Sequence, residues 1–276
     1  MAWFCRHILA GIANDWPDVT QDTPVIEIRD LHKAYGALEV LKGVSITAPK
    51  GHVISLIGSS GSGKSTLLRC CNLLEDSQQG EVLFKGEPVI WRGTGHGRRP
   101  ADPKQVLRIR TNLSMVFQQF NLWAHMTILQ NVMEAPLTVL RRDRAEVEAA
   151  ARAYLDKVGI GDKCDAYPAQ LSGGQQQRAA IARALCMEPE ALLFDEPTSA
   201  LDPELEQEVV KVIKDLASEG RTMMIVTHDM KLAADVSDTV VFLHQGLIEE
   251  QGTPETLFGA PKSERLRGFL SATHAA

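Results

Sequence analysis

The sequence has few cysteines and none of the spacings that build a disulfide framework or a zinc site. Its five cysteines are odd in number and include no C-x-x-C pair, so we expect the chain to work in a reducing cytosol. No stretch approaches the roughly 18 consecutive apolar residues that a transmembrane helix requires. The longest uncharged stretch, residues 111–133, is interrupted by polar side chains, and we therefore expect it not to cross a bilayer.

An excess of positive charge is also missing. Lysine and arginine number 29 against 35 aspartates and glutamates, which gives a net charge of −6. Proteins whose main partner is nucleic acid need a basic surface, so we expect no nucleic-acid partner. Residues 1–23 contain an apolar patch that is too short for a secretory signal and has no small-residue cleavage site. We predict a flexible leader there, or a start that has been assigned too far upstream.

The composition is that of an ordinary globular protein, and 276 residues suffice for about two compact units. Short β-branched apolar runs alternate with segments of helical periodicity, an order that predicts an α/β fold with a largely parallel sheet. From residue 105 to about 189 the pattern is mostly helical, which predicts an inserted second lobe. The predicted strands are residues 25–28, 44–46, 53–57, 81–84, 191–194, 222–226 and 239–243.

A glycine-rich segment, GSSGSGKST, follows the strand at 53–57 and precedes a helix predicted from Ser65 to Leu74. It fits the pattern G-x-x-x-x-G-K-[ST], in which backbone N–H groups and the helix N-terminus bind nucleotide phosphates. Lys64 would bridge the β- and γ-phosphates, and the Ser65 hydroxyl would coordinate Mg²⁺. A flexible turn is the alternative, but the position between a strand and a helix favours phosphate binding. The predicted binding residues are Gly58, Ser59, Ser60, Gly61, Ser62, Gly63, Lys64, Ser65 and Thr66.

Two adjacent carboxylates, Asp195 and Glu196, end the apolar run at 191–194. Carboxyl ends of parallel strands lie at the edge where open α/β sheets bind ligands. We expect Asp195 to hold Mg²⁺ and Glu196 to accept a proton from the attacking water. Without the glycine-rich segment, the same residues would be read as a strand that emerges into solvent.

The segment LSGGQ at 171–175 begins another helix. Ser172 and Gln175 have the spacing of a capping box, but Gly173 and Gly174 in a first helical turn each cost roughly 0.5–1 kcal/mol relative to alanine. We therefore interpret the glycines as an opening that lets a phosphate approach the helix N-terminus. Because one chain already has a complete phosphate loop, this terminus is predicted to act on the γ-phosphate of ATP held by a second copy.

Together, GSSGSGKST, LSGGQ, LLFDEP, SALD at 199–202 and the Thr227-His228-Asp229 triplet resemble the ATP-binding subunit of ABC transporters, from about Val25 to the C-terminus. The resemblance implies a P-loop NTPase ABC cassette: a RecA-like, mostly parallel sheet core with an N-terminal antiparallel β part and an inserted α-helical subdomain. The implied boundaries are residues 24–118 and 187–252 for the ATP-binding core, 119–186 for the helical signature subdomain and 253–276 for a C-terminal helical tail.

The resemblance also implies roles for single residues. Gln118 would be the glutamine that touches Mg²⁺ and links the two lobes, and Tyr35 would stack on adenine. His228 would contact the γ-phosphate and orient the water, and Asp202 would lie in a loop at the dimer interface. On their own, Tyr35 and His228 would be read as structural residues at strand ends.

Longer phrases, such as MVFQQFNLWAHMT at 115–127, are similar to the ATPase subunits of bacterial polar amino-acid importers, above all those for histidine, lysine, arginine and ornithine. This similarity implies ATP and Mg²⁺ as cofactors, a homodimer that closes on ATP, and a peripheral position on the cytoplasmic face of the inner membrane. The implied partners are two integral membrane permease subunits and, indirectly, an extracytoplasmic amino-acid-binding protein. The transported amino acid is not specified by this chain.

Apolar residues follow Gln118 directly, and they form either a docking surface for the permease or part of the helical lobe's core. They are Phe120, Leu122, Trp123 and Met126. Two other classes of function remain open: a soluble ABC-type ATPase that acts on nucleic acid or ribosomes, and a nucleotide-dependent switch without transport. The first usually has paired cassettes or basic extensions, and the second does not need the hydrolytic base Glu196.

Overall fold

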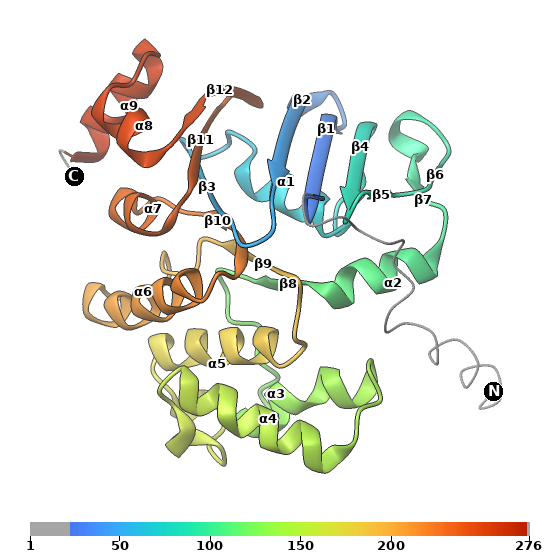
Figure 1. Cartoon of the computed structure of the whole chain (residues 1–276), viewed down its shortest axis with the longest axis vertical. Coiled ribbons are helices and arrows are strands. Elements are labelled where there is room, and N and C mark those ends of the chain that lie inside the picture. The colour runs from blue at the N-terminus through green and yellow to red at the C-terminus, as the bar shows by residue number, and fades with distance from the viewer. Residues whose placement is uncertain (1–22, 275–276) are drawn as a thin grey trace.

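A computed structural model describes residues 23–274 of the chain (Figure 1). The predicted leader, apart from its last residue, lies outside the described residues. Two large sheets, a two-stranded hairpin and a set of helices make up the described part of the fold, with the helices α3, α4 and α5 gathered at one end of the molecule in Figure 1.

The central sheet has six strands in the order β12-β11-β3-β10-β9-β8. Five of them run parallel, and β12 pairs antiparallel with β11. All residues of β3, β9 and β10 are buried, which explains their continuous apolar runs. The strands are β3 (Val53–Ile57), β8 (Leu113–Val116), β9 (Ala191–Asp195), β10 (Thr222–Val226), β11 (Thr239–His244) and β12 (Leu247–Gly252).

A second, antiparallel sheet has the order β2-β1-β4-β5. Its strands are β1 (Ile26–Tyr35), β2 (Leu38–Ala48), β4 (Gln79–Phe84) and β5 (Glu87–Pro88). A short hairpin of β6 (Trp91–Arg92) and β7 (Arg99–Pro100) follows. The mostly parallel core, the antiparallel N-terminal part and the inserted helices together confirm the predicted fold class.

The helices are α1 (Lys64–Cys71), α2 (Pro103–Asn112), α3 (Ile128–Thr138), α4 (Arg144–Lys157), α5 (Gly173–Leu185), α6 (Pro203–Ser218), α7 (Met230–Val236), α8 (Pro254–Gly259) and α9 (Glu264–His274). Among the described residues, none of these helices combines the length and the apolar character needed to span a bilayer. Alternate residues of β9 face opposite layers: Phe194 packs with the helical lobe and α6, and Leu193 packs with α1 and the antiparallel sheet. Both layers thus share the strand that carries the acidic pair.

Several predicted elements differ from the structure. The stretch predicted as mostly helical contains the strand β8, which follows α2 without a glycine or proline to mark the change. The strand β12 was also not predicted. The helix expected to reach Leu74 ends at Cys71 because Leu73 adopts a left-handed φ of 55°.

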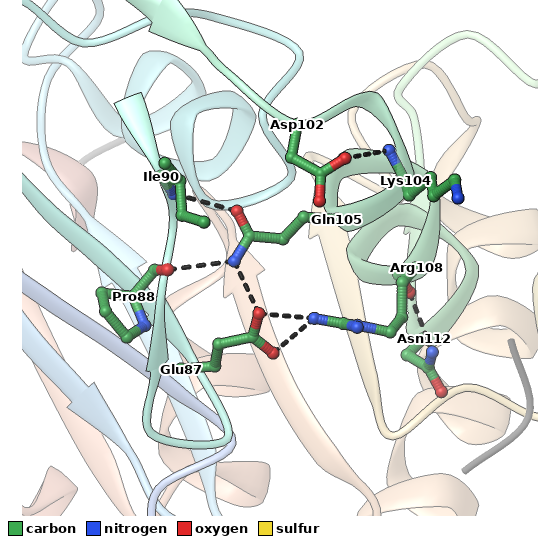
Figure 2. A network of polar contacts seen from close by, with 8 residues as sticks. All are labelled: Glu87, Pro88, Ile90, Asp102, Lys104, Gln105, Arg108 and Asn112. Atoms are coloured by element: carbon green, nitrogen blue, oxygen red, sulfur yellow. Dashed lines mark hydrogen bonds and ion pairs between the residues drawn. The ribbon is translucent and has the colours of Figure 1, made fainter. Parts of the chain in front are cut away.

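Side chains on α2 fasten it to β5 and the residues that follow β5, as Figure 2 shows. Gln105 accepts a hydrogen bond from the Ile90 amide at 2.9 Å and donates to Glu87 at 2.7 Å. Arg108 forms an ion pair with the same glutamate. Because α2 runs directly into β8, this anchor also fixes the strand that delivers Gln118 to the sheet edge.

Candidate active site

The glycine-rich loop connects β3 to α1, and close packing fixes its path. Gly58 has a φ of 145°, and a Cβ there would lie 2.2 Å from the Leu243 carbonyl oxygen. Gly63 has a φ of 105°, and a Cβ there would lie 2.8 Å from Leu41. Only glycine fits at both positions. No side chain caps the N-terminus of α1, so its first N–H groups are available to an anion.

Lys64 lies over this loop and is 4% exposed. Its Nζ donates to the carbonyl oxygens of Gly58 at 2.8 Å and Ser59 at 3.0 Å. Burial lowers the pKa of Lys64, while the negative charges of Glu196 and Asp195 raise it. The ammonium group and both carboxylates therefore share one electrostatic environment.

The acidic pair ends β9 as predicted. Asp195 is 4% exposed, and its Oδ2 lies 3.2 Å from Nη2 of Arg69, on α1. Glu196 adopts a left-handed φ of 51°, and its N–H donates to the Val226 carbonyl at 3.0 Å. Such a conformation is uncommon outside glycine, and it is typical of functional sites that the surrounding structure holds in place.

His228 faces Glu196 from the neighbouring strand. β9 and β10 are parallel with Asp195 opposite Val226, so the residues after both strands lie at the same edge of the sheet. There His228 Nε2 lies 2.8 Å from Glu196 Oε1. The pair lines a cavity of about 460 Å³ that also includes Thr198, Ser199 and Asp229.

Gln118 follows β8, and Tyr35 lies beside the end of the glycine-rich segment. Val116 pairs with Phe194 in the parallel strands β8 and β9, so Gln118 follows its strand at the edge where Glu196 follows its own. Burial raises the pKa of Tyr35, and a hydrogen bond with Thr66 at the end of the glycine-rich segment opposes the rise. The stacking of Tyr35 on adenine stays a prediction.

The predicted capping box at the start of α5 is present. Ser172 Oγ accepts from the Gln175 amide at 3.3 Å, and Gln175 Oε1 accepts from the Ser172 amide at 3.0 Å. Phosphate access is not the only reason for the two glycines, because packing within the chain also leaves little room for a side chain at either position. A Cβ on Gly173 would lie 3.1 Å from Leu201, and a Cβ on Gly174 would lie 3.1 Å from Leu205. The glycines let α5 approach the start of α6 closely.

The structure does not bring the signature segment to the phosphate loop of the same chain. In Figure 1, α5 lies with the helical lobe on one side of the central sheet, and α1 lies near the antiparallel sheet on the other. Among the described residues, none of the hydrogen bonds or ion pairs found joins Ser172 to Lys64, Asp195 or Glu196. Asp202 is exposed and its side chain does not cap α6.

A model of the ABC transporter family matches residues 41–199. This match covers more than half of the chain and includes the glycine-rich loop, the signature segment and the acidic pair. The chain belongs to the ABC transporter family.

Relatives of this ABC chain cover nearly its whole length. The histidine transport ATP-binding protein of Pseudomonas aeruginosa is 59% identical over 89% of this chain and 97% of its own. The octopine permease ATP-binding protein P of Rhizobium meliloti is 59% identical over 92% of this chain and 97% of its own. The histidine/lysine/arginine/ornithine transport ATP-binding protein of Escherichia coli is 56% identical over 90% of this chain and 97% of its own.

Solved structures confirm the ABC cassette. A protein of Clostridium perfringens, part of an ABC transporter complex, has a TM-score of 0.77 at 27% identity over 92% of this chain and 99% of its own. An ATP-binding cassette whose dimer binds ADP and phosphate has a TM-score of 0.72 at 32% identity over 83% of this chain and 98% of its own. These relatives favour the transporter interpretation over a soluble ATPase that acts on nucleic acid or ribosomes.

Sequence reasoning missed three residues that shape the ABC site and its surroundings: Arg69 beside Asp195, and Asn131 and Arg183 beside the residues after Gln118. Arg183 could have been noticed as a lone cation in an alanine-rich helical run. Asn131 could have been noticed as a polar residue in a stretch without charged residues. Among the apolar residues after Gln118, Trp123 is 40% exposed, whereas Leu122 packs partly against the core of the helical lobe.

Proposed function

We propose that this chain is the ATP-hydrolysing subunit of an importer for polar amino acids, above all the basic ones histidine, lysine, arginine and ornithine. The observation that carries the chemistry is the contact of 2.8 Å between Glu196 and His228 beside the phosphate loop. The names of the relatives, which include histidine, octopine and histidine/lysine/arginine/ornithine transport proteins, support the substrate class.

Hydrolysis transfers the γ-phosphoryl group of ATP to water, so catalysis depends on positioning and on charge stabilisation. Lys64 and the first N–H groups of α1 would hold the β- and γ-phosphates. Glu196 would accept a proton from the attacking water, and His228, hydrogen-bonded to it, would orient that water and contact the γ-phosphate.

The residues predicted to hold Mg²⁺ supply oxygen ligands: the Ser65 hydroxyl, the Gln118 amide oxygen and the Asp195 carboxylate. Mg²⁺ prefers such oxygens and usually keeps several of its waters, so a small set of side chains suits it. The metal, when bound, neutralises negative charge on the phosphates. The buried Asp195 faces the Arg69 guanidinium, and this ion pair supports the proposal that a positive charge fits at this position.

Two copies of the chain would complete each other's sites. Ser172 and Gly174 are separated from Lys64 within one chain, and the capped α5 terminus would meet the γ-phosphate bound by the partner. The exposed Asp202 would lie at the dimer interface. ATP that bridges both halves would favour the closed dimer, and loss of the γ-phosphate would reopen it.

Two integral membrane permease subunits would bind the surface formed by Phe120, Leu122, Trp123 and Met126. A cavity of about 340 Å³ that shares Met126 with this surface is lined by apolar and by polar or charged side chains, and it could receive a permease segment. Its lining residues are His125, Met126, Gln130, Met133, Glu134, Leu137 and Arg144. An extracytoplasmic receptor would select the amino acid. The chain would lie on the cytoplasmic face of the bacterial inner membrane.

Purification with its permease tests this function. We expect phosphate release by the assembled complex to rise when the receptor is loaded with a basic amino acid. Phosphate release that rises with RNA or ribosomes, and not with any loaded receptor, would instead assign the chain to the non-transport class.

A further inference from the structure

Residues 117–123, which contain Gln118 and three of the four residues of the proposed docking surface, lie along helix α5. Gln177 Nε2 donates to the Phe117 carbonyl at 3.3 Å. Arg183 donates through Nη2 to the Phe120 carbonyl at 3.1 Å and through Nη1 to the Asn121 carbonyl at 2.6 Å. Two side chains of α5 therefore hold the backbone on both sides of Gln118.

The segment needs such support because it has no regular secondary structure of its own. Asn121 adopts a left-handed φ of 51°, a conformation that asparagine tolerates better than most residues. Backbone carbonyls outside helices and sheets must find other donors when water does not reach them. Here α5 provides the donors.

Contacts extend along α5 from its first turn to its last. At the N-terminal end, a Cβ on Gly173 would lie 3.6 Å from Cζ of Phe120, so the phenyl ring lies directly over the signature glycine. At the C-terminal end, the Arg183 guanidinium lies 5.5 Å from the centre of the Trp123 ring. Burial lowers the pKa of Arg183, and the two carbonyls and the aromatic face offset the cost of burying its charge.

Helix α3 holds the other side of the same segment. Asn131 is fully buried; its Oδ1 accepts from the Trp123 amide at 2.7 Å, and its Nδ2 donates to the carbonyls of Trp123, Met126 and Thr127. The backbone of the docking surface is thus fixed between α3 and α5, without hydrogen bonds to α1 or the phosphate loop among the described residues.

We propose that Arg183 and Gln177 are positioning residues that join residues 117–123 to α5 as one rigid unit. The unit links two places that would otherwise be independent: Ser172, which would meet the partner's γ-phosphate, and Trp123, which would face the permease. ATP-driven closure at Ser172 would then move Trp123, and movement of the permease against Trp123 would move Ser172. This inference rests on the proposed dimeric ATPase.

Fluorine NMR of the full-length chain, labelled with 5-fluorotryptophan and carrying Glu196→Gln to prevent hydrolysis, tests the link. Trp123→Phe assigns the Trp123 resonance. We expect MgATP to shift this resonance as the dimer forms. Two variants weaken the link. Gln177→Met leaves the Arg183–Trp123 contact in place, and Arg183→Lys loses the forked donor. In both variants, the shift that MgATP induces should be at least about threefold smaller than in the parent, in the range of coupling changes seen for such contacts.

Arg152→Lys on α4 is the matched control, because Arg152 makes an exposed ion pair with Glu148 in the same lobe; its shift should equal that of the parent. ATP affinity and dimer mass, measured in parallel, separate the two proposals. If MgATP neither binds nor forms a dimer, the proposed function fails. If it binds and forms the dimer, but the Trp123 resonance stays still in the parent or shifts equally in all variants, only the link through α5 is overturned.

Discussion

His228 Nε2 lies 2.8 Å from Glu196 Oε1, although 32 positions separate the two residues in the chain. The parallel pairing of β9 and β10 places them together, because the residues after both strands emerge at one edge of the sheet. A carboxylate that is hydrogen-bonded to imidazole and held in a left-handed backbone conformation is a preorganised proton acceptor. The hydrolytic role that we propose for Glu196 depends on this contact.

Replacement of Glu196 by glutamine keeps the size of the side chain and removes its basicity. We expect the rate of phosphate release to fall by at least about 10²-fold, the usual contribution of a general base. ATP should still bind and hold the chain as a dimer, which light scattering would detect. Hydrolysis close to the parental rate would show that another group accepts the proton.

The Lys64→Ala variant loses the ammonium group over the phosphate loop. We expect ATP binding to become undetectable in calorimetric titration, because Lys64 Nζ is the ammonium group that bonds the loop carbonyls of Gly58 and Ser59. Lys42→Ala is the control, since Lys42 is exposed on β2 and should leave binding unchanged. Retained affinity in Lys64→Ala would contradict the assignment of the loop.

Arg69→Met leaves the buried Asp195 without the guanidinium beside it. We expect the free energy of unfolding to fall by about 1 kcal/mol, less than for a fully buried pair, because the Arg69 side chain is 46% exposed. Magnesium and ATP should restore most of the difference by supplying positive charge at Asp195. Urea titrations with MgATP and with EDTA measure this effect. Arg29→Met is the exposed control. An equal loss in both solutions would mean that Asp195 does not hold the metal.

Trp123→Asp places a charge on the proposed docking surface. The variant should bind ATP as the parent does, because Trp123 lies away from the phosphate loop, but it should co-purify with the permease at least about tenfold less, as for an aromatic anchor at an interface. Ile90→Asp is the matched control, since Ile90 is 56% exposed and lies before the β6–β7 hairpin. Equal recovery of both variants with the permease would remove the docking proposal.

Much of the site could be predicted because it is local in sequence. The phosphate loop lies between β3 and α1, the acidic pair ends a buried strand, and the capping box at Ser172 spans four consecutive residues. Each of these depends on backbone conformation and on neighbours only a few positions away. The same holds for the buried strands β3, β9 and β10, whose apolar runs are continuous.

The rest depends on tertiary contacts that no local pattern encodes. Gly173 and Gly174 are favoured partly because Leu201 and Leu205, before and within the first turn of α6, lie close to them, which the sequence of α5 does not reveal. The strand β8 follows α2 without a breaking residue and forms because β9 offers it a partner. Arg69 is 126 positions away in sequence from its partner Asp195, and Arg183 is 62 and 63 positions away from its partners Asn121 and Phe120.

In the proposed dimer, the signature segment of one chain completes the site of the other. A γ-phosphate-linked photoreactive ATP tests this with two distinguishable chains, one of which carries Lys64→Ala and should not bind nucleotide. We expect irradiation to label the peptide that contains Ser172 on the Lys64→Ala chain, in trans. Label found only on the chain that binds the nucleotide, with none on its partner's signature peptide, would contradict it.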